Sequence, residues 1–138
     1  MKVYVDSSVI VRLVAGEDDP IDDWGRWEYA ISNELATIET MRAIDRLRIL
    51  NQIDANIFSE YSRVAHALFE DLEIVLLQSP ILRRAGGSFP TVISTPDAIH
   101  LATALLWQED TGERLTFLTH DRQLRAAAQA CGFATSKL

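Results

Sequence analysis

Four acidic residues, Asp6, Glu39, Asp97 and Asp121, are the candidates for chemistry in this chain. Carboxylates that lie close together repel one another, and some of their pKa values rise unless a cation compensates the charge. Mg²⁺ and Mn²⁺ are hard ions that bind oxygen ligands, and the sequence has no pair of Cys or His residues at the spacing of zinc ligands. Grouped together, the four acids predict a Mg²⁺ site in which Mn²⁺ can substitute.

Each acid also has to be weighed against a purely structural role. Asp is a preferred N-cap and first-turn residue, so Asp6, Asp97 and Asp121 are each explained, taken singly, as helix caps. Glu39 differs because its predicted helix face carries small apolar residues, where a charge is costly without a partner. A bound cation would supply that partner.

The histidines do not form a ligand set. His66, His100 and His120 are scattered along the chain. His100 lies one turn after Asp97 on the same helix face, which allows a contact with the edge of a site. We interpret it as a packed or capping histidine rather than a ligand.

The positions of the acids depend on the elements that the sequence predicts. Short apolar runs typical of buried strands alternate with longer segments of helical spacing. Strands separated by helices imply a parallel sheet with helices on both faces, so we expect an α/β fold with four to five strands. The strands are expected at 3–5, 29–32, 74–77, 115–119 and, as an edge strand, 133–135. The helices are expected at 7–16, around 24–27, at 33–50 and 55–72, and from Ser79, Ser94 and His120 onward.

This topology would bring the four acids to one place. In an open parallel α/β sheet, ligands bind outside the carboxyl ends of the strands. Asp6 and Asp121 directly follow predicted strands, Asp97 lies in the first turn of its helix, and Glu39 lies about two turns into the helix after the second strand. We therefore expect all four to converge at one sheet edge.

Composition limits the class of protein. The chain has 138 residues, 13 of them basic and 20 acidic, and the net charge of −7 argues against loose, charge-driven nucleic-acid binding. Nine of the acids but only three of the bases fall within residues 1–40. The lone Cys131 excludes an internal disulfide and a cysteine zinc site. No apolar run is long enough to span a bilayer and no signal-peptide pattern is visible, so we expect a cytoplasmic protein without a membrane partner.

Four segments resemble the PIN-domain ribonucleases, and above all the VapC toxins of type II toxin-antitoxin pairs. The likeness covers essentially the whole chain in order, which implies a single PIN-like domain over residues 1–138. The most specific segments are those around Asp97 and Asp121. The four segments are 3–11 (VYVDSSVIV), 37–39 with Arg42-Ala43 after it, 97–104 (DAIHLATA) and 118–124 (LTHDRQL).

The resemblance implies a Mg²⁺-dependent endoribonuclease in which Asp6, Glu39, Asp97 and Asp121 hold one or two ions, with Ser7 or Thr119 adding a hydroxyl. The ions would activate water for attack on an RNA phosphodiester. It also implies a homodimer and a cognate antitoxin. Arg42 and Arg46, one and two turns beyond Glu39, are our candidates for RNA phosphate contacts. Many relatives carry an arginine shortly before the third acid, where this chain has Ser94-Thr95-Pro96.

Other interpretations remain open at this point. A receiver-like α/β signalling module would bind Mg²⁺ in a similar acidic pocket, but it needs a lysine on a late strand, and Lys2 and Lys137 lie at the chain termini. A PIN-like fold used only for binding is a further alternative. Trp24 and Trp27 would either line an antitoxin groove or pack in the core.

Overall fold

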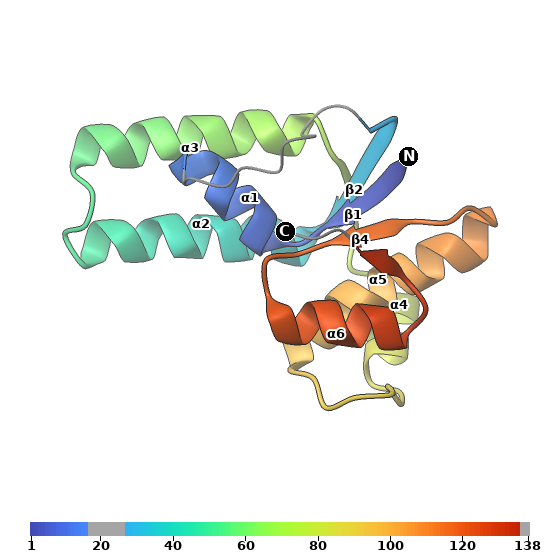
Figure 1. The fold of residues 1–138 in the computed structure, drawn as a ribbon. Coiled ribbons are helices and arrows are strands. Elements are labelled where there is room, and N and C mark those ends of the chain that lie inside the picture. Colours follow the sequence, from blue (N-terminus) through green and yellow to red (C-terminus); the bar gives the residue numbers. More distant parts are fainter. Residues whose placement is uncertain (17–26, 136–138) are drawn as a thin grey trace.

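The computed structural model describes residues 1–16 and 27–135. Within them, five strands form one sheet in the order β3-β2-β1-β4-β5, and every neighbouring pair is parallel (Figure 1). The strands are β1 Lys2–Val5, β2 Tyr29–Asn33, β3 Glu73–Val75, β4 Thr116–Leu118 and β5 Ala134–Thr135. The helices are α1 Ser7–Ala15, α2 Glu34–Ile49, α3 Ala55–Glu70, α4 Ser79–Ala85, α5 Thr95–Thr111 and α6 Arg122–Ala130.

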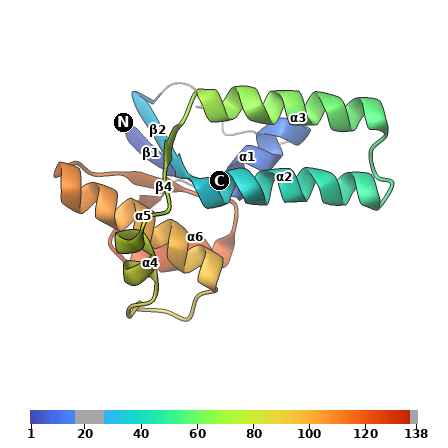
Figure 2. The same cartoon turned by 180° about the vertical axis from the view of Figure 1, so that it is seen from behind.

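Helices cover both faces of the sheet, as Figures 1 and 2 show from opposite sides. Because side chains alternate along a strand, Val3 and Val5 of β1 point into one core and Tyr4 into the other. The first core is closed by α1, α2 and α3, which pack against one another. The second core is closed by α5 and α6, and α4 packs on α5. Each face therefore buries its own apolar set around the central strand.

The helices that carry the acids begin with well-defined caps. Asp6 caps α1, Asn33 caps α2 and Asp121 caps α6, each accepting a hydrogen bond from the backbone N–H three residues later. Ser94 caps α5 in the same way. Because β1, β2 and β4 are parallel and each leads directly into α1, α2 or α6, the first turns of these helices lie at the carboxyl end of the sheet.

The expected α/β architecture with helices on both faces is confirmed. The third strand begins one residue earlier than expected and ends two residues earlier, at Val75, because only these residues pair with β2. The helix expected around 24–27 lies outside the described residues apart from Trp27, which packs against the first core. No helix in the described parts is both long and apolar enough to cross a membrane.

Candidate active site

Asp6 lies where β1 ends and α1 begins, and it is almost fully buried. Its Oδ1 accepts hydrogen bonds from Ser8 Oγ at 2.6 Å and from the Val9 backbone N–H at 3.3 Å. Its Oδ2 accepts a hydrogen bond from Thr119 Oγ1 at 2.6 Å. The carboxylate is therefore fixed by its own helix and by the segment that follows β4.

The hydroxyl groups around Asp6 connect two loops. Thr119 Oγ1 also accepts from the Asp121 backbone N–H at 3.0 Å, and Ser8 Oγ accepts from the His120 backbone N–H at 2.9 Å. The sequence prediction named Ser7 or Thr119 as the hydroxyl near the acids. Thr119 does contact Asp6, but the second hydroxyl belongs to Ser8. The reason is geometric, because an N-cap side chain faces the second and third helical residues, and Ser7 is the first.

Burial raises the pKa of the Asp6 carboxyl above its usual value, and the hydrogen bonds from Ser8 and Thr119 offset only part of that rise. The charged form of Asp6 is therefore costly in the folded chain. A cation at this position would lower that cost.

Asp97 lies in the first turn of α5 and is partly buried, and Asp121 lies at the cap of α6. Burial is the main cause of a raised pKa at Asp97, the neighbouring Asp121 carboxylate is the second, and Asp6 adds to it. The structure thus brings Asp6, Asp97 and Asp121 close enough for their charges to interact, as expected from the topology.

Glu39 joins this group through a histidine. His100 Nε2 and Glu39 Oε1 lie 2.6 Å apart, and the other ring nitrogen, Nδ1, lies 2.8 Å from the Tyr4 hydroxyl. His100 is only 2% exposed, so this contact with Glu39 is shielded from solvent. The expectation of a packed histidine holds, but His100 also contacts the acid group. The one signal in the sequence was its position one turn after Asp97.

The donor set suits a hard divalent cation, although its side chains do not form a finished coordination sphere. The acids provide carboxylate oxygens, which Mg²⁺ and Mn²⁺ prefer, and burial, the main cause of the raised pKa values of Asp6 and Asp97, makes their charged forms costly without a cation. Within residues 1–16 and 27–135, no three His, Cys, Asp or Glu side chains are placed so that they could hold one metal ion. The chemistry of the ligands therefore fits, and ion binding would require their side chains to draw closer.

Arg42 and Arg46 lie on the outer part of α2, where both are exposed. With Ala43, Ile49 and Leu50 they line a shallow hollow of about 500 Å³. Arg42 Nη1 also donates to Asp45 Oδ2 at 3.0 Å, so part of its charge is compensated within the helix. Both arginines are free to reach solvent, and neither is held against the acids.

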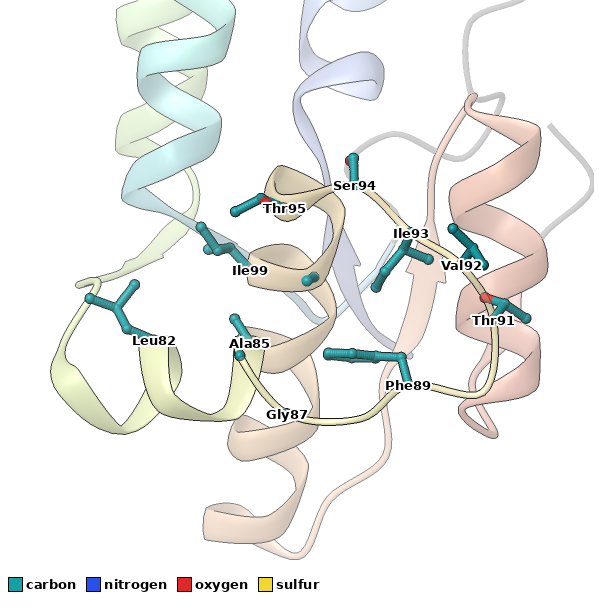
Figure 3. A pocket seen from close by; sticks show the side chains of 12 residues that line it. Leu82, Ala85, Gly87, Phe89, Thr91, Val92, Ile93, Ser94, Thr95 and Ile99 are labelled. Carbon is teal, nitrogen blue, oxygen red and sulfur yellow. The ribbon is translucent and has the colours of Figure 1, made fainter.

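A separate pocket of about 510 Å³ lies between α4, the segment 86–94 and the first turns of α5 (Figure 3). Leu82, Phe89, Ile93 and Ile99 give it an apolar lining, and Ser94 and Thr95 stand at its edge. Asp97 follows Thr95 but does not line this pocket. The pocket therefore borders the helix that carries Asp97 without containing an acidic group.

The lysine that a receiver-like module would need is not found near the acids in the described residues. Lys2 lies at the start of β1, at the opposite end of the strand from Asp6, and its Nζ is 2.6 Å from Glu113 Oε2. Lys137 lies outside the described residues. This placement gives the receiver-like interpretation no support.

Comparison with known proteins agrees with this geometry. The chain is 33% identical over 135 residues to Ribonuclease VapC46 of Mycobacterium tuberculosis, covering 96% of this chain and 94% of that protein. It is 27% identical to Ribonuclease VapC47 of the same species, covering 97% of this chain and 95% of the relative. The likeness to these relatives thus extends over nearly the full length of each.

Solved structures show the same fold at low sequence identity. The toxin-antitoxin complex from Klebsiella pneumoniae superposes with a TM-score of 0.68 at 17% identity, covering 98% of this chain and 96% of that one. VapBC2 from Rickettsia felis, bound to a DNA fragment from its promoter, gives a TM-score of 0.68 at 9% identity, with 99% and 98% covered. The family described as PIN domain matches residues 3–130. The chain therefore belongs to the PIN-domain family, and among its members it resembles the VapC ribonucleases.

Proposed function

We propose that this protein is a metal-dependent endoribonuclease that acts as the toxin of a toxin-antitoxin pair. The observation that carries the proposal is the convergence of Asp6, Asp97 and Asp121 at the carboxyl end of the sheet, with Glu39 linked to them through His100. The names of the two VapC ribonucleases support RNA as the substrate. The domain would extend over residues 1–138, beyond the matched 3–130.

The four acids would hold the cation, with Mg²⁺ as the first choice and Mn²⁺ as a substitute. When bound, such an ion lowers the pKa of a coordinated water and neutralises charge that develops on the phosphate. The protein's part is to hold the ligands in place. Ser8 and Thr119 fix both oxygens of Asp6, and the caps of α5 and α6 fix the backbone at Asp97 and Asp121.

RNA would approach along α2, because Arg42 and Arg46 place positive charge one and two turns beyond Glu39 on that helix. Phosphate contacts position a strand without reading its sequence, which suits two exposed arginines on one helix. Because the chain has a net charge of −7, RNA binding would be limited to contacts with the cation and a few arginines.

The remaining expectations concern partners and location. Several solved structures of this fold are toxin-antitoxin complexes, which supports a cognate antitoxin as a partner. The excess of acids in residues 1–40 would favour a basic antitoxin segment. A homodimer and a cytoplasmic location complete the proposal.

The test is RNA cleavage by the purified protein with Mg²⁺, with Mn²⁺ and with EDTA, and by an Asp97→Asn variant. Asp110→Asn is the matched control, since Asp110 is an exposed carboxylate near the other end of the same helix. We expect cleavage by the wild type and by Asp110→Asn only with metal, and little or none by Asp97→Asn. Equal cleavage by all three proteins, or full activity in EDTA, would refute the proposal.

A further inference from the structure

We infer that His100 is a positioning residue for Glu39, and that Tyr4 fixes the ring of His100 so that Nε2–H points at the carboxylate. The inference rests on the proposed metal site and adds to it two residues that are not themselves ligands. One contact joins Tyr4 on strand β1 to His100 on helix α5, and the next joins His100 to Glu39 on helix α2.

The hydrogen-bonding chemistry decides the state of the ring. A carboxylate can only accept, so Nε2, at 2.6 Å from Glu39 Oε1, must carry a proton. In a neutral imidazole the other nitrogen is then unprotonated and must accept. Tyr4 is the donor at 2.8 Å, because a tyrosine keeps its hydroxyl proton at neutral pH. In the neutral ring, the pair of contacts therefore selects the Nε2–H tautomer, and a protonated ring would present the same Nε2–H donor to Glu39.

The ring has little freedom to move. Tyr4 and His100 are both buried, and their rings meet edge to face with centroids 5.9 Å apart. Tyr4 also stacks on Phe117 of β4, with centroids 5.0 Å apart. The donor that faces Glu39 is therefore held by two strands of the sheet.

A second contact between the same two helices supports this arrangement. Asn33, the cap of α2, donates from Nδ2 to Thr103 Oγ1 at 2.9 Å, and Thr103 lies one turn after His100 on α5. The two contacts fix the start of α2 against α5 at two points. Glu39 is thus held with Oε1 bonded to His100, while Oε2 remains for a ligand bond.

A positioning role has a consequence that simple packing does not. Residues that orient the ligands of a metal change its affinity about 10- to 100-fold when they are replaced. A side chain that only fills the core changes stability and leaves metal affinity alone. His100→Gln is the informative conservative variant, because its amide can donate from near the position of Nε2, whereas His100→Leu cannot donate.

The first measurement is NMR of the metal-free protein with ¹⁵N-labelled histidine, which reads the ring state without activity. We expect His100 in the Nε2–H form, assigned by the signals missing in His100→Gln. In Tyr4→Phe, the Nδ1 signal should move toward that of a ring nitrogen without a hydrogen bond. A ring without a proton on Nε2, or an unmoved signal in Tyr4→Phe, would overturn the inference.

The second measurement is Mn²⁺ affinity without RNA, by calorimetry or electron paramagnetic resonance. His100→Leu should bind about 10- to 100-fold more weakly, Tyr4→Phe should lose less, and His100→Gln should keep most of the affinity. Thr40→Val is the control. Thr40 follows Glu39 in the sequence, its side chain is buried, and its hydroxyl has no hydrogen-bond partner among the described residues.

The outcomes separate the two proposals. Normal Mn²⁺ binding by the wild type with equal binding by His100→Leu would overturn the role of His100 alone. Absence of Mn²⁺ binding by the wild type would overturn the proposed metal function together with this role. If His100→Leu does not fold, the Mn²⁺ affinities of His100→Gln and Tyr4→Phe are compared with that of the wild type. We then expect a loss of Mn²⁺ affinity in Tyr4→Phe only.

Discussion

Replacing Asp6 by Asn should stabilise the metal-free protein while weakening its response to metal. Burial raises the pKa of Asp6, so the ionised carboxylate costs free energy in the folded chain. Asn is nearly the same shape, can still cap α1 through its side-chain oxygen, and carries no charge. The loss of the favourable charge at the helix N-terminus opposes this gain, but the raised pKa shows that burial outweighs it.

The expected gain is about 1 to 2 kcal/mol at neutral pH, the size that mutational data assign to a buried polar group with incomplete compensation. For a chain of 138 residues this corresponds to roughly 3 to 7 °C in Tm. The pH dependence follows from the sign of the shift. A raised pKa gives the wild type its full stability below the unfolded value of about 3.9, and that contribution is lost as pH rises through the folded value. Asp6→Asn should therefore be more stable than the wild type at pH values above the folded pKa of Asp6, and this difference should disappear at low pH.

The assay is thermal unfolding in EDTA from pH 4 to 8, repeated at pH 7.5 with increasing Mn²⁺. Asp54→Asn is the matched control, because Asp54 caps α3 in the same way, with Oδ1 2.8 Å from the Ile57 N–H, but is exposed. It should change Tm little at any pH. At 100 times the Kd, a bound ion stabilises a protein by about 2.7 kcal/mol, and Asp6→Asn should lose most of this gain. A lower Tm for Asp6→Asn than for wild type in EDTA at pH 8 would refute the reasoning.

Three further predictions follow from contacts in the structure. Asn33→Leu removes the cap of α2 and the donor to Thr103, and it should cost about 2 kcal/mol of unfolding free energy in urea titrations. Thr119→Val removes a donor to Asp6, so Mn²⁺ affinity should fall about 10-fold or more by calorimetry. Arg46→Ala should weaken binding of catalytically inactive protein to single-stranded RNA and lower the slope of log K against log salt by about 0.7; an unchanged slope would contradict the phosphate contact.

Much of the fold could be predicted because its signals are local. The apolar runs and helical spacings locate the strands and helices, and the alternation of the two element types implies a parallel sheet. The four acids could be named for the same reason, since each lies just after a strand or within the first turns of a helix. The structure brings Asp6, Asp97 and Asp121 together as the topology requires.

What could not be predicted depends on contacts between residues far apart in the chain. His100 meets Glu39 across 61 positions and Tyr4 across 96, and no spacing rule connects such residues. Whether Ser7 or Ser8 donates to Asp6 depends on the direction of the Asp6 side chain at the cap of α1. Whether Trp24 lines a groove concerns a residue outside the described part of the chain.

The hydrogen bond between Thr119 and Asp6 joins residues that are 113 positions apart. A ribosome makes Asp6 well before β4 and Thr119, because synthesis follows the order of the sequence. The contact that fixes Oδ2 of the carboxylate cannot form until the chain has been synthesised through Thr119 and β4 has paired with β1. A chain that stops before β4 therefore lacks an assembled site, and a nuclease built in this way would have no activity until that strand has been made.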